Sequence, residues 1–367
     1  QNRVFQSHAG RRIVLATNVA ETSITVPGIR YVIDPGTVRM SRYSVRSKIQ
    51  RLPIEAVSQA SANQRKGRCG RISEGICYRL YSEDDFVNRP EFTDPEILRT
   101  NLAAVILKMM DSGIGDVSEF EFIDPPDNRS WNDGYKLLHE LGAVDEKRVI
   151  TKIGRQLASL PTDPRLGKML LNASINNALK EVLIIVSGLS IQDPRERPSD
   201  RQQAADQAHT KYKDPESDFV AYLNIWTEYE KERQELSSNQ LKRFCQKNFL
   251  SFMRMREWRE IHRQLHLALK DMQLNENKQD SNFDAIHQSL LSGMLGNVGR
   301  HEEKREYHGC RNRKFNLFPG SALNKKRPKW IFSAEIVETQ QVFARNNAKI
   351  DPAWVEPLAP HLIKKSW

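Results

Sequence analysis

The sequence has 367 residues, of which 39% are hydrophobic and 28% are charged. This composition excludes an intrinsically disordered tail, and at about 100–200 residues per domain the length predicts two to four domains. The longest aliphatic run, residues 182–186, is far shorter than the roughly 20 apolar residues of a membrane span, so no membrane partner is expected. The net charge of +10 permits a polyanionic partner, and the excess of basic residues lies in residues 1–92 and 281–367.

The first 92 residues alternate short apolar strands with turns and one helix. Strands are expected at Arg12–Ala16, Tyr31–Ile33 and Gly75–Tyr81. Ser58 is placed to cap a helix that runs to about Arg71. Strands that alternate with helices indicate an α/β layer with parallel strands.

Between these elements, Val38–Tyr43 and Lys48–Leu52 flank a turn and predict a hairpin. Its alternation is basic rather than apolar, through Arg39, Arg42, Arg46 and Lys48. A solvated edge hairpin protected by positive charge is one interpretation of this pattern.

The remaining residues predict three further domains. Helices at Ile97–Met110 and Trp131–Leu141, followed by short strands within Val144–Thr151, outline a winged helix. Helices dominate from residue 153 to about residue 292, and strands with Gly and Pro turns follow, which favours a small barrel. The fold class is therefore multi-domain: a partial α/β domain at residues 1–92, a winged helix at 93–155, a helical bundle at 156–285 and a barrel at 286–367.

The segment QRKGRCGR at residues 64–71 is the strongest chemical signal. Positions i, i+4 and i+7 share one stripe of a helix, so Gln64, Arg68 and Arg71 are expected to project together. Gly67 and Gly70 leave the backbone open to close approach. Two guanidinium groups beside a carboxamide suit a phosphoryl-transfer transition state, whereas the alternative is a solvated basic face.

A second signal, TNVAETSIT at residues 17–25, directly follows the first expected strand. Ligands of α/β proteins bind at the carboxyl ends of strands, where these hydroxyl and amide side chains would lie. Taken alone, the segment is better interpreted as a cluster of capping residues. Its position some 40 residues before the Gln/Arg segment favours a shared site.

TNVAETSITVPGIRYVIDPG and QRKGRCGR resemble motifs V and VI of the DEAH-box helicases. The similarity is to the bacterial HrpA-type branch and covers essentially the whole chain. EILRTNLAAVILKM resembles the winged helix of that family, LASLPTDPRLGKML the entry to its ratchet-like helical domain, and the residues after about 292 its OB-like domain. The α/β domain would then be the second RecA-like domain, truncated at its N-terminus.

The resemblance implies roles for individual residues. Arg68 and Arg71 match the arginine fingers that reach the γ-phosphate of ATP, and Gln64 matches the glutamine near the attacking water. Residues expected near the nucleotide are Phe5, which stacks on the base, Ser23, Thr25 and Gly67. Thr17 and Asn18 match positions at the nucleic-acid backbone. The basic hairpin resembles the protruding hairpin of the second RecA-like domain, which implies that Arg39, Arg42, Arg46 and Lys48 bind nucleic acid. Pro27 departs from the pattern, because members of the family often carry an aspartate there.

Near the C-terminus, Lys325, Lys326 and Arg327 form a basic patch beside Trp330 and Phe332. On an OB-like barrel such a patch suits single-strand binding by phosphate contact and stacking. A solvated loop before a core strand is the alternative.

Two motifs of an ATP site do not occur in this sequence: the P-loop and the Asp-Glu-x-His segment. We expect both in a first RecA-like domain of the same protein, preceding Gln1, which would hold most of the contacts to Mg²⁺ and ATP. This chain alone is therefore expected not to hydrolyse NTP. No metal ligands are assigned to it.

The expected function is part of an ATP-dependent 3′-to-5′ RNA helicase, an enzyme whose partner is single-stranded RNA. A DNA helicase and a non-catalytic nucleic-acid adaptor are the alternatives. Four scattered cysteines without a CxxC pair, and the lack of a signal peptide, favour a reducing cytoplasm.

Overall fold

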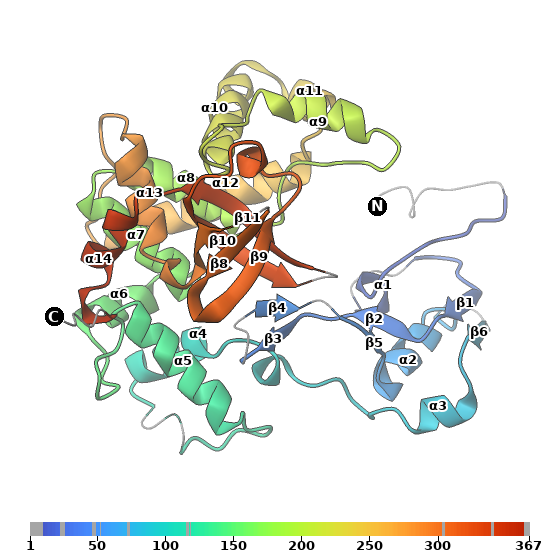
Figure 1. Ribbon diagram of the computed structural model, residues 1–367. Helices are drawn as coiled ribbons and strands as arrows, with labels where there is room; N and C mark the ends of the chain where they lie inside the picture. The colour runs from blue at the N-terminus through green and yellow to red at the C-terminus, as the bar shows by residue number, and fades with distance from the viewer. Residues whose placement is uncertain are drawn as a thin grey trace. The chain divides into compact units, whose positions relative to one another are not determined.

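The computed structural model describes residues 10–22, 26–45, 49–51, 53–71, 74–114, 117, 119–302, 305–338 and 341–362 (Figure 1). The chain forms two compact units, residues 1–100 and residues 101–367. No helix within the described ranges is both long and apolar enough to cross a membrane.

The first unit contains a parallel strand pair covered on one face by a helix. Strand β1 (Tyr31–Asp34) pairs with β6 (Ile76–Arg79), which confirms the parallel α/β expectation. Helix α2 (Gln59–Lys66) packs against β1 and is capped by Ser58, whose hydroxyl accepts the Ser61 amide at 3.2 Å. Two short helices, α1 (Val19–Thr22) and α3 (Glu83–Val87), complete the unit.

The strand expected at residues 12–16 does not form. The segment has no regular structure, and the side chains of Ile13 and Leu15 are 83% and 94% exposed. A β-strand is held by hydrogen bonds to a neighbouring strand. Within the described part of the chain no strand pairs with this segment, so its apolar residues alone do not make it a strand.

The predicted hairpin forms as two short antiparallel pairs. Strand β2 (Thr37–Arg39) pairs with β5 (Ile54–Ala56), and β3 (Arg42–Ser44) pairs with β4 (Ile49–Arg51). The first predicted arm is therefore interrupted between β2 and β3, and the second contains only β4, because β5 follows the predicted end at Leu52.

The second unit begins with the winged-helix outline. Helix α4 (Ala103–Asp111) packs on α5 (Asn128–Glu140), and Gly134 permits this contact because a Cβ there would lie 2.5 Å from the Ile106 side chain. A bridge between Val144 and Ile150 replaces the two expected strands and leads into α6 (Lys152–Ser159). The helix expected from residue 97 begins only at Ala103, because residues 96–98 form a separate 3₁₀ turn.

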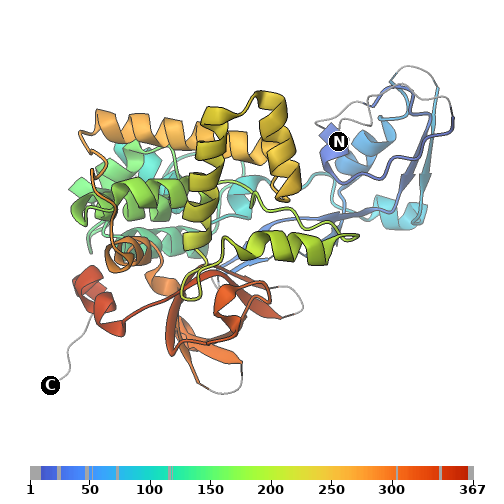
Figure 2. The same cartoon turned by 90° about the horizontal axis from the view of Figure 1, so that it is seen from above.

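A helical core follows, in agreement with the expected helical region. Its centre is Trp258, which is fully buried and donates its indole N–H to the Ile184 carbonyl and the Ser187 hydroxyl at 3.0 Å each. The longest of these helices, α12, is drawn in orange in Figure 2. The helices are α7 (Pro164–Ile175), α8 (Leu179–Leu189), α9 (Gln202–Thr210), α10 (Val220–Glu235), α11 (Ser238–Lys247), α12 (Phe252–Asp271) and α13 (Phe283–Leu291).

The C-terminal strands close into a five-stranded barrel, as the sequence predicted. Neighbouring strands follow the order β7-β8-β9-β11-β10, and β10 returns to β7; only β9 and β11 are parallel. This connectivity is that of an OB fold. The strands are β7 (Val298–His301), β8 (Glu306–Gly309), β9 (Arg313–Leu317), β10 (Trp330–Glu338) and β11 (Val342–Lys349), with the short helix α14 (Val355–Leu358) after them.

The loop between α9 and α10 extends along β11 and joins the helices to the barrel. Ser217 bridges to Ala348, and the Asp218 amide donates to the Asn347 carbonyl at 2.7 Å. Beneath this loop His287 is fully buried. Its Nδ1 lies 2.7 Å from the Phe283 carbonyl, which can only accept, so Nδ1 carries the proton and Nε2 accepts from the Ser217 hydroxyl at 2.7 Å.

We expect His287 to make the second unit sensitive to acid. Burial lowers the pKa of His287 to about 4, although the carboxylates of Asp214 and Glu216 act in the opposite direction. The unfolded chain takes up this proton near pH 6.5 and the folded chain only near pH 4, so the free energy of unfolding falls by about 3 kcal/mol between these values. Unfolding midpoints measured from pH 7 to pH 4 for His287→Gln should fall less steeply than for the unchanged chain; equal slopes would contradict the assignment.

Candidate functional site

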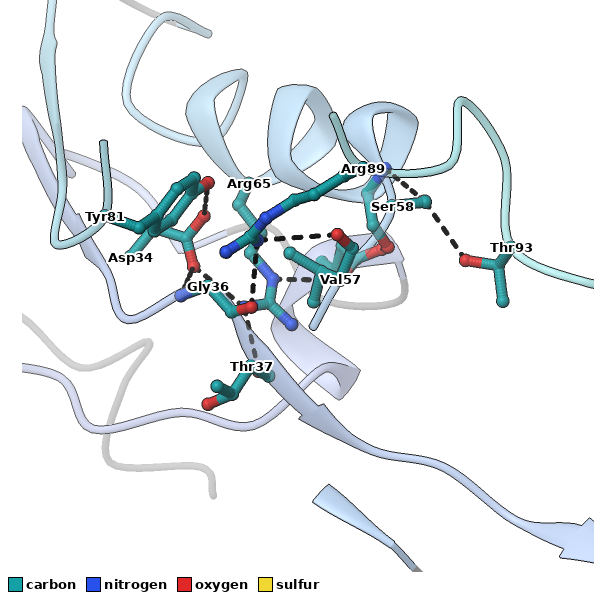
Figure 3. A network of polar contacts seen from close by, with 11 residues as sticks. Asp34, Gly36, Thr37, Val57, Ser58, Arg65, Tyr81, Arg89 and Thr93 are labelled. Carbon is teal, nitrogen blue, oxygen red and sulfur yellow. Dashed lines mark hydrogen bonds and ion pairs between the residues drawn. The ribbon is translucent and has the colours of Figure 1, made fainter. Parts of the chain in front are cut away.

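The candidate site is built on Arg65, near the end of α2. Its Nη1 donates to Asp34 Oδ1 at 2.8 Å and to the Thr37 carbonyl at 3.1 Å (Figure 3). Its Nε donates to Glu21 Oε2 at 3.1 Å, and the Ser61 hydroxyl donates to the other Glu21 oxygen. One guanidinium therefore joins α1, α2 and the end of β1.

Asp34 is the buried acceptor of this network. It receives the Gly36 amide and the Tyr81 hydroxyl, each at 2.9 Å, in addition to Arg65 (Figure 3). Burial by itself raises the pKa of Asp34, but the hydrogen bonds from Arg65, Gly36 and Tyr81 outweigh it and lower that pKa. Asp34 is therefore a carboxylate at neutral pH.

Arg89 supports the network from the opposite side. Its guanidinium lies 3.8 Å from the centre of the Tyr81 ring and donates to the Gly36 carbonyl at 2.9 Å (Figure 3). Gly36 has a φ of +74°, and a Cβ there would lie 2.5 Å from the Tyr81 ring. Only glycine fits this turn, which fixes the strand end that carries Asp34.

The predicted Gln/Arg stripe is wrong in its geometry. Helix α2 ends at Lys66, and Gly67 is its C-cap. Arg68 and Arg71 therefore lie in the turn after the helix and not on the helix that carries Gln64. The amide of Gly67 still donates to Asn63, but the helical pattern does not continue through the second glycine. Glycine disfavours a helix interior, and the helix ends where two glycines follow within four residues.

Arg68 and Arg71 nevertheless remain within electrostatic reach of one another. Burial and the positive charge of Arg71 lower the pKa of Arg68, while Glu21 opposes this weakly. The Nε and Nη1 atoms of Arg68 are buried and have no hydrogen-bond partner in the part of the chain that the structure describes. Arg71 and Gln64 are exposed. Two close guanidinium groups, one with unsatisfied donors, form a site that an anion would complete.

The candidate residues of the first motif are only partly described. Thr17 and Asn18 are exposed and begin α1, since their carbonyls accept the Ala20 and Glu21 amides at 3.0 and 2.9 Å. Phe5, Ser23 and Thr25 lie outside the described residues.

The hairpin residues have different surroundings. Arg39 is exposed on β2. Arg42 is held by two carboxylates: Nε and Nη2 contact Glu55 at 2.6 and 2.8 Å, and Nη1 contacts Asp94 at 2.7 Å. Its guanidinium therefore ties the hairpin to the segment that follows α3. Arg46 and Lys48 lie outside the described residues.

The basic patch of the barrel is exposed only in part. Lys325 and Lys326 are exposed, whereas Arg327 is half-buried with a φ of +43° and donates to the Asn324 carbonyl at 3.2 Å. The expected stacking role of Phe332 is wrong, because it is fully buried and stacks on Phe219 at 5.1 Å. Both faces of β10 are buried at this position, and Phe332 lies in the core.

Four family models match the chain in the order that the motifs predicted. The helicase conserved C-terminal domain matches residues 1–73, and the winged-helix part of the helicase-associated domain (HA2) matches residues 135–162. The ratchet-like part of HA2 matches residues 163–251, and the oligonucleotide/oligosaccharide-binding (OB) fold matches residues 286–363.

Curated relatives match over the whole length of this chain. The ATP-dependent RNA helicase HrpA of Escherichia coli is 57% identical over 373 residues, which cover 100% of this chain and 29% of that protein. The HrpA homolog of Haemophilus influenzae is also 57% identical, over 375 residues and 29% of its length. The human protein named "Probable ATP-dependent RNA helicase DHX35" is 34% identical, over 100% of this chain and 52% of that protein. The chain thus spans less than a third of the HrpA relatives.

The sequence alone did not assign a role to the residues that support the two candidate segments. Arg65 lies within residues 64–71 and Glu21 within residues 17–25. Asp34 ends β1, a position where α/β proteins place functional groups, but the sequence around it indicates only a turn. No group of three or more His, Cys, Asp or Glu that could hold a metal ion occurs in the described ranges.

Proposed function

We propose that this chain is part of an ATP-dependent RNA helicase, in which Arg68 and Arg71 bind the γ-phosphate of ATP. The unsatisfied Nε and Nη1 of Arg68 carry the proposal. Buried donors without acceptors are rare, and the phosphate oxygens of a nucleotide would satisfy them. The like charge of Arg71 disfavours the empty pair and favours an anion between the two groups.

In this proposal the two arginines stabilise the charge that develops on the transferred phosphoryl group. Gln64, exposed on the last turn of α2, orients the attacking water. Gly67 and the open space around Gly70 let the backbone approach the nucleotide, since a Cβ at Gly70 would meet nothing within 4 Å. Phe5, Ser23 and Thr25 complete the nucleotide contacts through the resemblance.

The rest of the ATP site belongs to a first RecA-like domain of the same full-length protein. That domain is proposed to supply the P-loop and the ligands of Mg²⁺, and no step of the reaction is assigned to a metal on this chain. The chain alone, purified as 367 residues, is therefore expected not to hydrolyse ATP. Measurable RNA-stimulated hydrolysis by the isolated chain would contradict this division of the site.

Nucleic acid is proposed to contact several surfaces of the chain. Thr17 and Asn18 are exposed at the start of α1, and Arg39 is exposed on β2. Lys325 and Lys326 extend the contact on the barrel. We propose single-stranded RNA as the substrate, along which the helicase moves in the 3′-to-5′ direction. For the four domains we propose the predicted boundaries of 1–92, 93–155, 156–285 and 286–367. Arg42 is the weakest of these candidates, because Glu55 and Asp94 already neutralise it.

The test uses the full-length protein with Arg71→Ala. We expect ATP turnover to fall by about 10³-fold or more while single-stranded RNA remains bound, and unwinding of a 3′-tailed duplex to be lost. A non-catalytic adaptor would show no ATP turnover to lose. Competition between RNA and DNA strands of the same sequence at a stated salt concentration separates an RNA from a DNA helicase.

A further inference from the structure

Arg65 lies between two carboxylates from different elements and is itself almost buried. The side chains of Arg65, Glu21 and Asp34 are 14%, 10% and 0% exposed. Glu21 lies on α1, the helix that directly follows Thr17 and Asn18. Asp34 is the last residue of β1. Arg65 is on α2, next to Gln64 and one short turn before Arg68.

Two nitrogen atoms of the Arg65 guanidinium hold three acceptors. Nε faces Glu21, and Nη1 is shared by Asp34 and the Thr37 carbonyl. The Ser61 hydroxyl adds a second link from α2 to Glu21. Helix α1 has four residues and no buried side chain, so apolar packing contributes little to its position. The polar contacts to α2 are therefore what fixes it.

We propose that Arg65 is a positioning residue that couples the nucleic-acid side of the first unit to its ATP side. This inference rests on the proposed function. A displacement of Thr17 and Asn18 by a bound strand is passed through α1 and Glu21 to Arg65, and so to the helix end that carries Gln64 and Arg68. The rigid planar fork of arginine is suited to this link, because one group holds partners in separate directions.

Asp34 makes the link stiff on the other side. Its second oxygen is held by Tyr81, and Gly36 holds the first, so the carboxylate has no freedom to follow Arg65. Movement of α1 relative to α2 must then break the contact to Glu21 rather than the contact to Asp34. Glu21 is the partner through which the coupling can be removed selectively.

The test measures, in the full-length protein, the RNA concentration that gives half-maximal stimulation of ATP hydrolysis. We expect Glu21→Gln and Arg65→Gln each to raise this concentration on the order of tenfold, and the double variant to raise it no further. Arg65→Lys keeps the charge but not the fork, so it should behave like Arg65→Gln. The matched control is Arg79→Gln, because Arg79 donates to Asn63 of α2 at 2.8 Å but is not bonded to α1.

Multiplicative effects of the two single changes, or an effect of Arg79→Gln equal to that of Arg65→Gln, would overturn the proposal. If thermal unfolding shows that Arg65→Gln does not fold, the comparison of Glu21→Gln with Arg79→Gln still tests the coupling. Glu21→Gln should raise the RNA concentration for half-maximal stimulation, and Arg79→Gln should not. An unchanged protein whose ATP hydrolysis does not respond to RNA would instead refute the proposed function, so the two failures are distinguishable.

Discussion

Replacement of Arg68 by alanine in the full-length protein is expected to lower ATP turnover by about 10³-fold or more without weakening the fold. The catalytic loss follows from the role of an arginine finger, which neutralises charge in the transition state. The fold should keep its stability because Nε and Nη1 of Arg68 form no hydrogen bond to any residue that the structure describes. Their burial without partners costs free energy, so the thermal unfolding midpoint is expected to stay unchanged or to rise.

Two variants control this experiment. Arg68→Lys keeps the positive charge but loses the planar fork, and we expect it to remain strongly impaired. Lys66→Ala removes an exposed basic side chain from the last turn of α2, and turnover should stay near that of the unchanged protein. Full turnover by Arg68→Ala, or a marked drop in its unfolding midpoint, would show that the residue supports the fold rather than the reaction.

Asp218→Ala is expected to destabilise the junction between the helices and the barrel. The free energy of local opening there should fall by about 3 kcal/mol. Asp218 accepts from the Ser321 hydroxyl at 2.6 Å, the Ala322 amide at 2.8 Å and the Asn347 amide at 2.9 Å. Alanine leaves these donors without their acceptor. Hydrogen exchange at the Ala322 and Asn347 amides measures the loss locally, so it does not require the whole chain to unfold in one step.

The matched control for this junction is Asp206→Ala. Asp206 also pairs with its partner Arg197 through two short contacts, at 2.8 and 2.7 Å, but the side chains of Arg197 and Asp206 are 57% and 50% exposed. Exposed ion pairs contribute about 0–1 kcal/mol, so exchange in the barrel should be unchanged. Equal exchange rates at Asn347 in Asp218→Ala and in the unchanged chain would contradict the assigned role of Asp218.

Several features could be predicted because their signals are local or repeat along the chain. The apolar segments around Tyr31 and Ile76 predicted the parallel strands, and the Gly- and Pro-punctuated strands after residue 292 predicted the barrel. Ser58 predicted the start of α2, since a capping side chain acts on amides only three residues away. The residues of motifs V and VI carried the family resemblance in the same way, through composition and spacing.

Other features depended on partners that are distant in the sequence. The segment at residues 12–16 has the composition of a strand, but no strand among the described residues pairs with it. Phe332 took a core position although it follows a basic patch. Arg42 looked like a free cation until the fold placed Glu55 and Asp94 beside it. Composition cannot reveal such pairings, because they join residues that only folding brings together.

The roles of the basic residues likewise depend partly on the sequence and partly on the fold. The sequence by itself determined the kinds of domain, their order, and the presence of two guanidinium groups near a carboxamide. Only the tertiary structure decided which cations are already neutralised, as Arg42 and Arg65 are, and which are left with unsatisfied donors, as Arg68 is. Backbone propensity acts over a few residues, whereas burial and charge pairing are set by contacts across the fold.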